Sequence, residues 1–192
     1  MFRPALTCLA CLLLASAQAL AAPAGRQDEM EGFLADRGLL TQIDQVRQSV
    51  STRASDLVVN AMGFLGVPYK RGGNTAESGF DCSGFVRAMY QQTVGLVLPR
   101  KAEQQAAATE KIDKRDLAPG DLVFFNTMRR TFSHVGIYIG DGKFIHSPRT
   151  GGEVRVENMG DSYWKKRFDG ARRVSNEQAD PASANGSAGK RP

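Results

Sequence analysis

Three residues of this sequence have the types that thiol-based catalysis needs. The chain has 192 residues, with three cysteines and two histidines. Cys8 and Cys11 lie in an apolar N-terminal run, so Cys82 is the one thiol in the body of the chain. A thiolate is a strong nucleophile, and an imidazole is the usual base that activates it. Cys82, His134 and His146 are therefore the candidate catalytic residues.

The residues around Cys82 predict that it lies at the start of a helix. The segment Asp81–Gly84 is small and polar, and apolar residues at helical spacing follow up to about Thr93. Asp81 is the predicted N-cap. At a helix N-terminus the dipole and the unpaired N–H groups stabilise a thiolate, which predicts a lowered pKa for Cys82 and part of an oxyanion hole. Taken alone, an inert buried cysteine is an equally good interpretation.

The two histidines lie in a predicted β-hairpin, and its turn decides whether they meet. The strands of this hairpin are predicted at 133–139 and 143–147. A two-residue turn, Asp141-Gly142, would put His134 and His146 on opposite faces. A three-residue loop, 140–142, is the next commonest type and would make them diagonal neighbours on one face, about 7–8 Å apart at the backbone.

We favour the three-residue loop because of Gly136. In that register Gly136 lies opposite His146, and its missing side chain leaves room for the imidazoles. The other face of the strand, with the branched residues at 135, 137 and 139, would then face the core. His134 would act as the base, and His146 would fix the tautomer and angle of the His134 ring.

The rest of the pattern predicts a single α+β domain at 54–174. A helix is predicted at Asp56–Leu65, ended by Gly66-Val67-Pro68, and a glycine-rich loop follows at 70–79. From Ala118 onward short strands are predicted at 122–125, in the hairpin and at 152–157. Helices first and strands later are typical of helices packed on an antiparallel sheet.

Three segments outside this domain have their own patterns. Residues 1–21 have a basic start, an apolar run and a small-x-small site at Ala19–Ala21, which predicts a cleaved signal peptide and an exported, periplasmic or secreted protein. A membrane anchor would need a longer apolar run, and acylation at Cys8 or Cys11 would need a shorter one. Residues 22–53 predict an amphipathic helical extension, and residues 175–192 predict a disordered tail.

Several motifs resemble the NlpC/P60 family of cell-wall peptidases. They occur in the family's order between Asp56 and Val174, and the main ones are Gly66–Gly73, Phe80–Val86, Leu98–Arg100, Pro119–Phe125 and Ser133–Gly140. The resemblance implies a papain-like core with the nucleophile at the N-terminus of a central helix. It also implies cleavage of peptide bonds in peptidoglycan stem peptides by Cys82, His134 and His146, without a metal or another cofactor.

The resemblance also suggests substrate-binding residues. Tyr69 matches a tyrosine near the active site, where it would assist the oxyanion hole or the substrate; the alternative is a tyrosine that closes a loop onto the core. Asp81 and Ser83 match positions in the substrate groove, although capping residues would look the same. The surplus of 25 basic over 20 acidic residues lies in the domain and would attract stem-peptide carboxylates. The candidates for that contact are Arg71, Arg100, Lys101 and Arg149.

Other functions are compatible with the same residues. Cys82, His134 and His146 could be three zinc ligands with an open fourth position. A non-catalytic wall-binding protein and a cysteine-dependent acyltransferase are the other two alternatives. Nucleic-acid binding is disfavoured by the export signal and by the lack of a recognisable motif. The sequence leaves open whether the cleaved bond lies within one stem peptide or in a crosslink, and it leaves the oligomeric state open.

Overall fold

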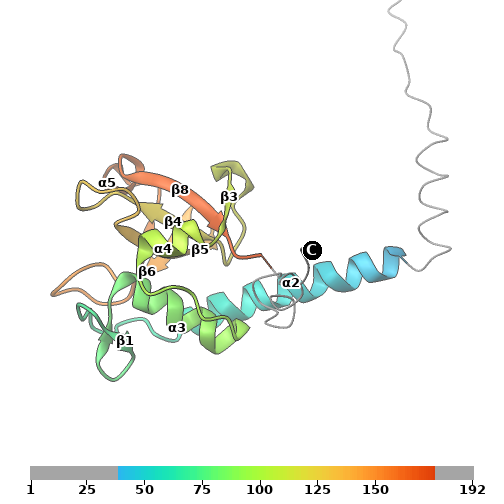
Figure 1. Ribbon diagram of the computed structural model, residues 1–192, viewed down its shortest axis with the longest axis horizontal. Helices are drawn as coiled ribbons and strands as arrows, with labels where there is room; N and C mark the ends of the chain where they lie inside the picture. The colour runs from blue at the N-terminus through green and yellow to red at the C-terminus, as the bar shows by residue number, and fades with distance from the viewer. Residues whose placement is uncertain (1–38, 176–192) are drawn as a thin grey trace, which may run out of the picture. The chain divides into compact units, whose positions relative to one another are not determined.

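A computed structural model of the protein describes residues 39–175, so the predicted signal peptide and nearly all of the predicted tail lie outside the described residues. The helices within this range are α2 (Leu39–Met62), α3 (Cys82–Val94), α4 (Ala102–Ala107), α5 (Ser162–Lys165) and a short 3-10 turn at Lys114–Asp116. The strands are β1 (Asn74–Thr75), β2 (Gly79–Phe80), β3 (Glu110–Ile112), β4 (Leu122–Phe125), β5 (His134–Gly140), β6 (Lys143–His146), β7 (Arg155–Asn158) and β8 (Phe168–Arg173). Figure 1 shows the course of the chain.

Six strands form one antiparallel sheet, in the order β3-β8-β4-β5-β6-β7. Helix α3 packs beside this sheet and contacts β5 (Figure 1). Strands β1 and β2 form a separate two-stranded ribbon just before α3. The prediction of an α+β fold with helices on an antiparallel sheet is confirmed.

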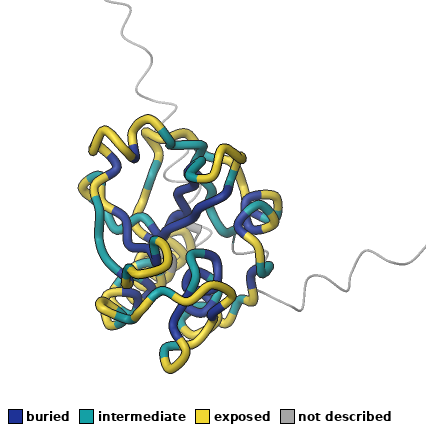
Figure 2. Tube along the Cα trace, turned by 90° about the vertical axis from the view of Figure 1, so that its left-hand side faces the viewer, coloured by how far each residue is buried: buried dark blue, intermediate teal, exposed yellow. Residues whose placement is uncertain are grey.

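Apolar residues cover both faces of the sheet. On the α3 side, buried side chains of the helix pack against alternate residues of the central strands, among them Leu122, Ile137 and Ile145. On the opposite side, a mostly aromatic cluster contains Phe125, Phe144 and Trp164. Because both faces are covered, the central strands form the buried interior of the domain, and exposed stretches lie around them (Figure 2).

The turn between β5 and β6 differs from our expectation. The three-residue loop would pair Ile139 with Lys143, but Gly140 pairs with Lys143, which leaves a two-residue turn at Asp141-Gly142. Both turn residues have positive φ, 52° and 70°, as a type I′ turn requires. The register then shifts between Tyr138 and Gly140, so that Ile137 pairs with Ile145. A bulge therefore restores the register that the three-residue loop would have produced.

Helix α2 is longer than the predicted helix at 56–65. It begins at Leu39 and ends at Met62, so it joins that helix to part of the predicted N-terminal extension. Residues 39–45 of α2 belong to a separate N-terminal unit, and the part of α2 from Val46 belongs to the unit that contains the sheet. In that second unit, Leu57 and Ala61 are buried in the core on the α3 side of the sheet.

Within residues 39–175, no helix has the length and apolarity to span a membrane.

Gly136 tests whether the hairpin register depends on close packing. A Cβ at this position would lie 2.7 Å from Cδ2 of Phe144 and 3.1 Å from Cβ of His146. We expect Gly136→Ala to lower the free energy of unfolding by about 1–3 kcal/mol, because the buried neighbours must move. Urea denaturation measures the change. Gly160→Ala is the matched control, since its Cβ would meet a side chain only, that of Asn158. Equal stability of the two variants would contradict the argument.

Candidate active site

A cavity of about 650 Å³ opens at the N-terminus of α3. Cys82, His134 and Tyr69 line it, together with Trp164 from α5 and Glu157 from β7. Residues that are far apart in the sequence thus meet in one cleft. The structure brings the predicted nucleophile and the predicted base together there.

Cys82 is the first residue of α3, as predicted. The N-cap is Asp81, whose Oδ1 accepts a hydrogen bond from the Gly84 N–H at 2.7 Å. Its other oxygen, Oδ2, accepts from the Gly72 N–H at 3.0 Å. The same carboxylate therefore starts the helix and anchors the glycine-rich loop beside it.

Arg100 is bound to that carboxylate. Its Nη1 and Nη2 lie 2.9 Å from Oδ1 and 2.6 Å from Oδ2 of Asp81, a bidentate ion pair. Nη1 also donates to Oγ of Ser83 at 3.1 Å. These three predicted substrate-binding residues thus contact one another, and none is among the described residues that line the cavity. Their contacts support the start of α3, and their role in substrate binding stays a prediction.

The direction predicted for the thiol pKa is wrong. Burial and the negative charge of Asp81 raise the pKa of Cys82 to about 11. Backbone hydrogen bonds from Val135 and Ser83 and the charge of Arg100 lower it, but they are outweighed. The helix N-terminus is present, yet removal from water destabilises the thiolate more than the hydrogen bonds and the charge of Arg100 stabilise it. Without substrate, Cys82 is a neutral thiol at neutral pH.

His134 and His146 meet on one face of the sheet, which confirms their predicted proximity. Nε2 of His134 lies 2.7 Å from Nδ1 of His146, and the ring planes are nearly perpendicular, at 88°. The indole of Trp164 stacks on His134, with ring centroids 5.5 Å apart. The Trp164 indole and the rings of Phe125 and Phe144 form the aromatic surroundings that hold both imidazoles in place.

Both imidazoles are neutral at neutral pH. Burial, with the neighbouring His146 and Arg155, holds the pKa of His134 well below the usual imidazole range. Burial also lowers the pKa of His146, although the hydrogen bond and charge of Glu157 oppose this shift. A neutral His134 can accept a proton, which is the property that a general base needs.

Glu157 is a functional candidate that the sequence analysis missed. Its Oε2 lies 2.9 Å from Nε2 of His146, on the side away from His134. Its Oε1 accepts hydrogen bonds from Arg155. The register of β6 and β7, which pairs His146 with Arg155, makes Glu157 a diagonal neighbour of His146. The alternation of Arg155 and Glu157 in a predicted strand was the available signal, but it could not give this register.

The candidate zinc ligands do not form a ligand cluster in the described part of the chain. Among residues 39–175, no three His, Cys, Asp or Glu side chains are grouped as a metal site. Nε2 of His134 and Nδ1 of His146 are instead paired with each other at a hydrogen-bond distance.

An α+β fold that sets a helix-starting cysteine beside a histidine pair has the architecture of papain-like proteins. The chain belongs to the NlpC/P60 family, whose model matches residues 66–173. A crystal structure of an NlpC/P60 family protein from Bacillus cereus has a TM-score of 0.59 and 37% identity; the match covers 63% of this chain and 40% of that one. The predicted family and papain-like fold are confirmed.

Curated relatives share the sequence of this domain. The chain is 45% identical over 121 residues to the gamma-DL-glutamyl hydrolase of Bacillus subtilis, and this match covers 62% of this chain and 29% of the relative. It is 42% identical over 126 residues to the murein DD-endopeptidase MepH of Escherichia coli, and this match covers 64% of this chain and 46% of the relative. The matched region thus spans less than half of either relative.

The raised pKa of Cys82 predicts slow alkylation at neutral pH. We expect the rate with iodoacetamide to rise about tenfold per pH unit from pH 7 to pH 10, because only the thiolate reacts and its fraction grows up to a pKa of about 11. Stopped-flow kinetics on protein with Cys8 and Cys11 changed to serine would measure this rate. The urea-unfolded protein is the control, with a thiol pKa of about 8.5. A plateau below pH 8 in the folded protein would instead indicate a preformed thiolate–imidazolium pair.

Proposed function

We propose that this protein is a cysteine endopeptidase that cleaves peptide bonds in peptidoglycan. One observation carries the proposal: Cys82 and His134 line one cavity, and His134 is hydrogen-bonded to His146 inside an NlpC/P60 domain. Relatives named murein DD-endopeptidase and peptidoglycan hydrolase support the substrate class. Such a substrate lies outside the cytoplasm, which agrees with the export predicted from residues 1–21.

The first chemical step would join thiol attack to proton transfer. Nε2 of His134 is occupied by His146, so Nδ1 is the ring nitrogen available to the thiol proton. As Sγ of Cys82 bonds to the carbonyl carbon, the proton moves to Nδ1 and the carbonyl oxygen becomes an oxyanion. Because nucleophile and base both start neutral, charge appears only when the substrate is present.

Tyr69, whose backbone is bridged to Phe80 just before α3, is a candidate oxyanion donor. Burial and the negative charge of Asp81 raise the pKa of its phenol, so the hydroxyl keeps its proton at neutral pH. Tyr69 lines the same cavity as Cys82. A protonated phenol and the backbone N–H of Cys82 would together stabilise the negative oxygen.

The second half of the reaction would regenerate the thiol. Protonated His134 gives its proton to the leaving amine, the peptide C–N bond breaks, and the acyl group stays on Sγ as a thioester. Water then attacks the thioester while His134 accepts its proton, and the returning thiolate takes that proton as the carboxylic acid leaves. The bonds made and broken need no cofactor.

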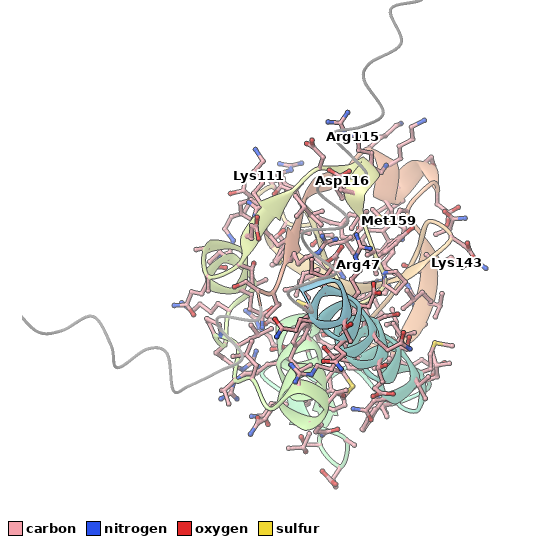
Figure 3. The ribbon with its side chains drawn as sticks, turned by 90° about the vertical axis from the view of Figure 1, so that its right-hand side faces the viewer. Arg47, Lys111, Arg115, Asp116, Lys143 and Met159 are labelled. Carbon is pink, nitrogen blue, oxygen red and sulfur yellow. The ribbon has the colours of Figure 1, made fainter. Side chains whose placement is uncertain are left out.

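The charges around the cavity favour Arg149 as the contact for a substrate carboxylate. Of the four basic candidates, Arg149 lines the cavity, whereas Arg71, Arg100 and Lys101 are not among its described lining residues. Lys111, Arg115 and Lys143 are exposed and lie at the outer edge of the view in Figure 3, and they are not among the described residues that line the cavity. Arg149 is thus the proposed anchor for an acidic stem peptide.

Digestion of purified sacculi and defined muropeptides tests the proposed activity. We expect wild-type protein to release peptide fragments and Cys82→Ala to reduce the rate by at least about 10³-fold, because the nucleophile is lost. Mass spectrometry of the products identifies the cleaved bond, within a stem or in a crosslink. Identical product profiles from wild type and Cys82→Ala would refute the peptidase proposal and favour a wall-binding protein.

Arg149 can be tested by its effect on KM. Arg149→Gln should raise KM for a muropeptide about tenfold with little change in kcat, because a charge-assisted hydrogen bond to the substrate contributes about 1.5 kcal/mol. Lys111→Gln removes the same charge from an exposed strand outside the cavity and is the control. An equal rise in KM for both variants would mean that the overall field of the protein attracts the substrate.

A further inference from the structure

We propose that Glu157 is a positioning residue that orients the hydrogen bonds through His146 and thereby keeps Nδ1 of His134 free to accept the proton of Cys82. Its effect on catalysis rests on the proposed peptidase function, but the hydrogen-bond direction itself does not. Four side chains carry the inference, from Arg155 through Glu157 and His146 to His134.

Arg155 fixes which oxygen of Glu157 faces the imidazole. Nε and Nη2 of Arg155 lie 2.8 Å and 2.7 Å from Oε1 of Glu157, so both donors use the same oxygen. Oε2 is left for Nε2 of His146 at 2.9 Å. Because a guanidinium has donors and no acceptor, the atom of residue 157 that faces Arg155 must be an acceptor.

Glu157 is ionised at neutral pH. Burial alone would raise its pKa, but the hydrogen bond with His146 and the charge and hydrogen bond of Arg155 outweigh burial and hold the pKa below the usual range. An ionised carboxylate accepts hydrogen bonds and cannot donate them. His146 must therefore donate its Nε2–H to Glu157.

The direction of the remaining bonds follows from this donor. A neutral His146 that is protonated on Nε2 has a lone pair on Nδ1, so it accepts a hydrogen bond there. The group 2.7 Å from Nδ1 is Nε2 of His134, which must then carry the hydrogen. In neutral His134 the lone pair is left on Nδ1, the nitrogen that would take the thiol proton. One carboxylate thus selects the tautomer of two rings.

Glu157→Gln should reverse the whole chain of hydrogen bonds. The amide oxygen must serve Arg155, so the amide NH2 faces Nε2 of His146, which becomes an acceptor. His146 then carries its hydrogen on Nδ1 and donates to Nε2 of His134. That ring in turn is protonated on Nδ1, and it can no longer accept the proton of Cys82.

Nitrogen NMR measures this reversal directly, because the chain has two histidines and their ring nitrogens can be labelled selectively. In untagged, full-length protein we expect both rings to be protonated on Nε2 in wild type and on Nδ1 in Glu157→Gln. Adding Arg155→Met to Glu157→Gln frees the amide to turn its oxygen toward His146, and should restore the wild-type tautomers. Nε2-protonated rings in Glu157→Gln, or no restoration in the double variant, would overturn the proposal.

Muropeptide cleavage provides the second readout. Glu157→Gln should lower kcat about 10²-fold or more, because it places the ring hydrogen of His134 on Nδ1, the nitrogen that would accept the thiol proton. Glu157→Ala removes the hydrogen bond to His146 without reversing the others and should cost about tenfold. A role in packing alone predicts the opposite order, since glutamine nearly matches glutamate in shape. If wild type cleaves no muropeptide, the peptidase proposal fails while the NMR result still decides the role of Glu157.

Discussion

The candidate site depends on the hydrogen bond between His134 and His146, which the backbone of the β5–β6 hairpin makes possible. The type I′ turn alone would place the two rings on opposite faces, and the bulge after Tyr138 corrects the register by one residue. Gly136 then provides the space in which the rings can approach, since any larger residue would contact Phe144 and His146. The turn, the bulge and Gly136 are thus all needed to bring the two imidazoles into hydrogen-bond contact on one face of the sheet.

Two ion pairs flank a group of neutral catalytic candidates. Asp81 and Arg100 hold the start of α3, and Glu157 and Arg155 hold the far end of the histidine pair. Between them, burial keeps the thiol and both imidazoles uncharged. In such an environment an unpaired charge is unfavourable. We therefore expect the proton to move from Cys82 to His134 only when a substrate carbonyl is present to take up the negative charge. The fixed charges therefore position the reacting groups without ionising them.

Strand β8 shows why part of the fold was not predicted. Its sequence, Phe168–Arg173, contains charged residues and no alternating pattern, yet it lies between β3 and β4. Arg173 binds the buried carboxylate of Asp121 at 2.7 Å, and Arg172 donates to a backbone carbonyl of α4. These charges are satisfied by partners distant in sequence, so the strand could not be recognised from its own composition.

The sequence by itself determined the chemistry of the candidate site and much of its local structure. It identified one thiol and two imidazoles, the helix that begins at Cys82 with Asp81 as its cap, and strand β4 at 122–125, because capping and apolar patterns act over a few residues. The tertiary structure alone decided the bulge, the direction of the thiol pKa, the stacking of Trp164 and the contact of Glu157 with His146. These depend on strand register and on burial, which arise only when segments distant along the chain pack together.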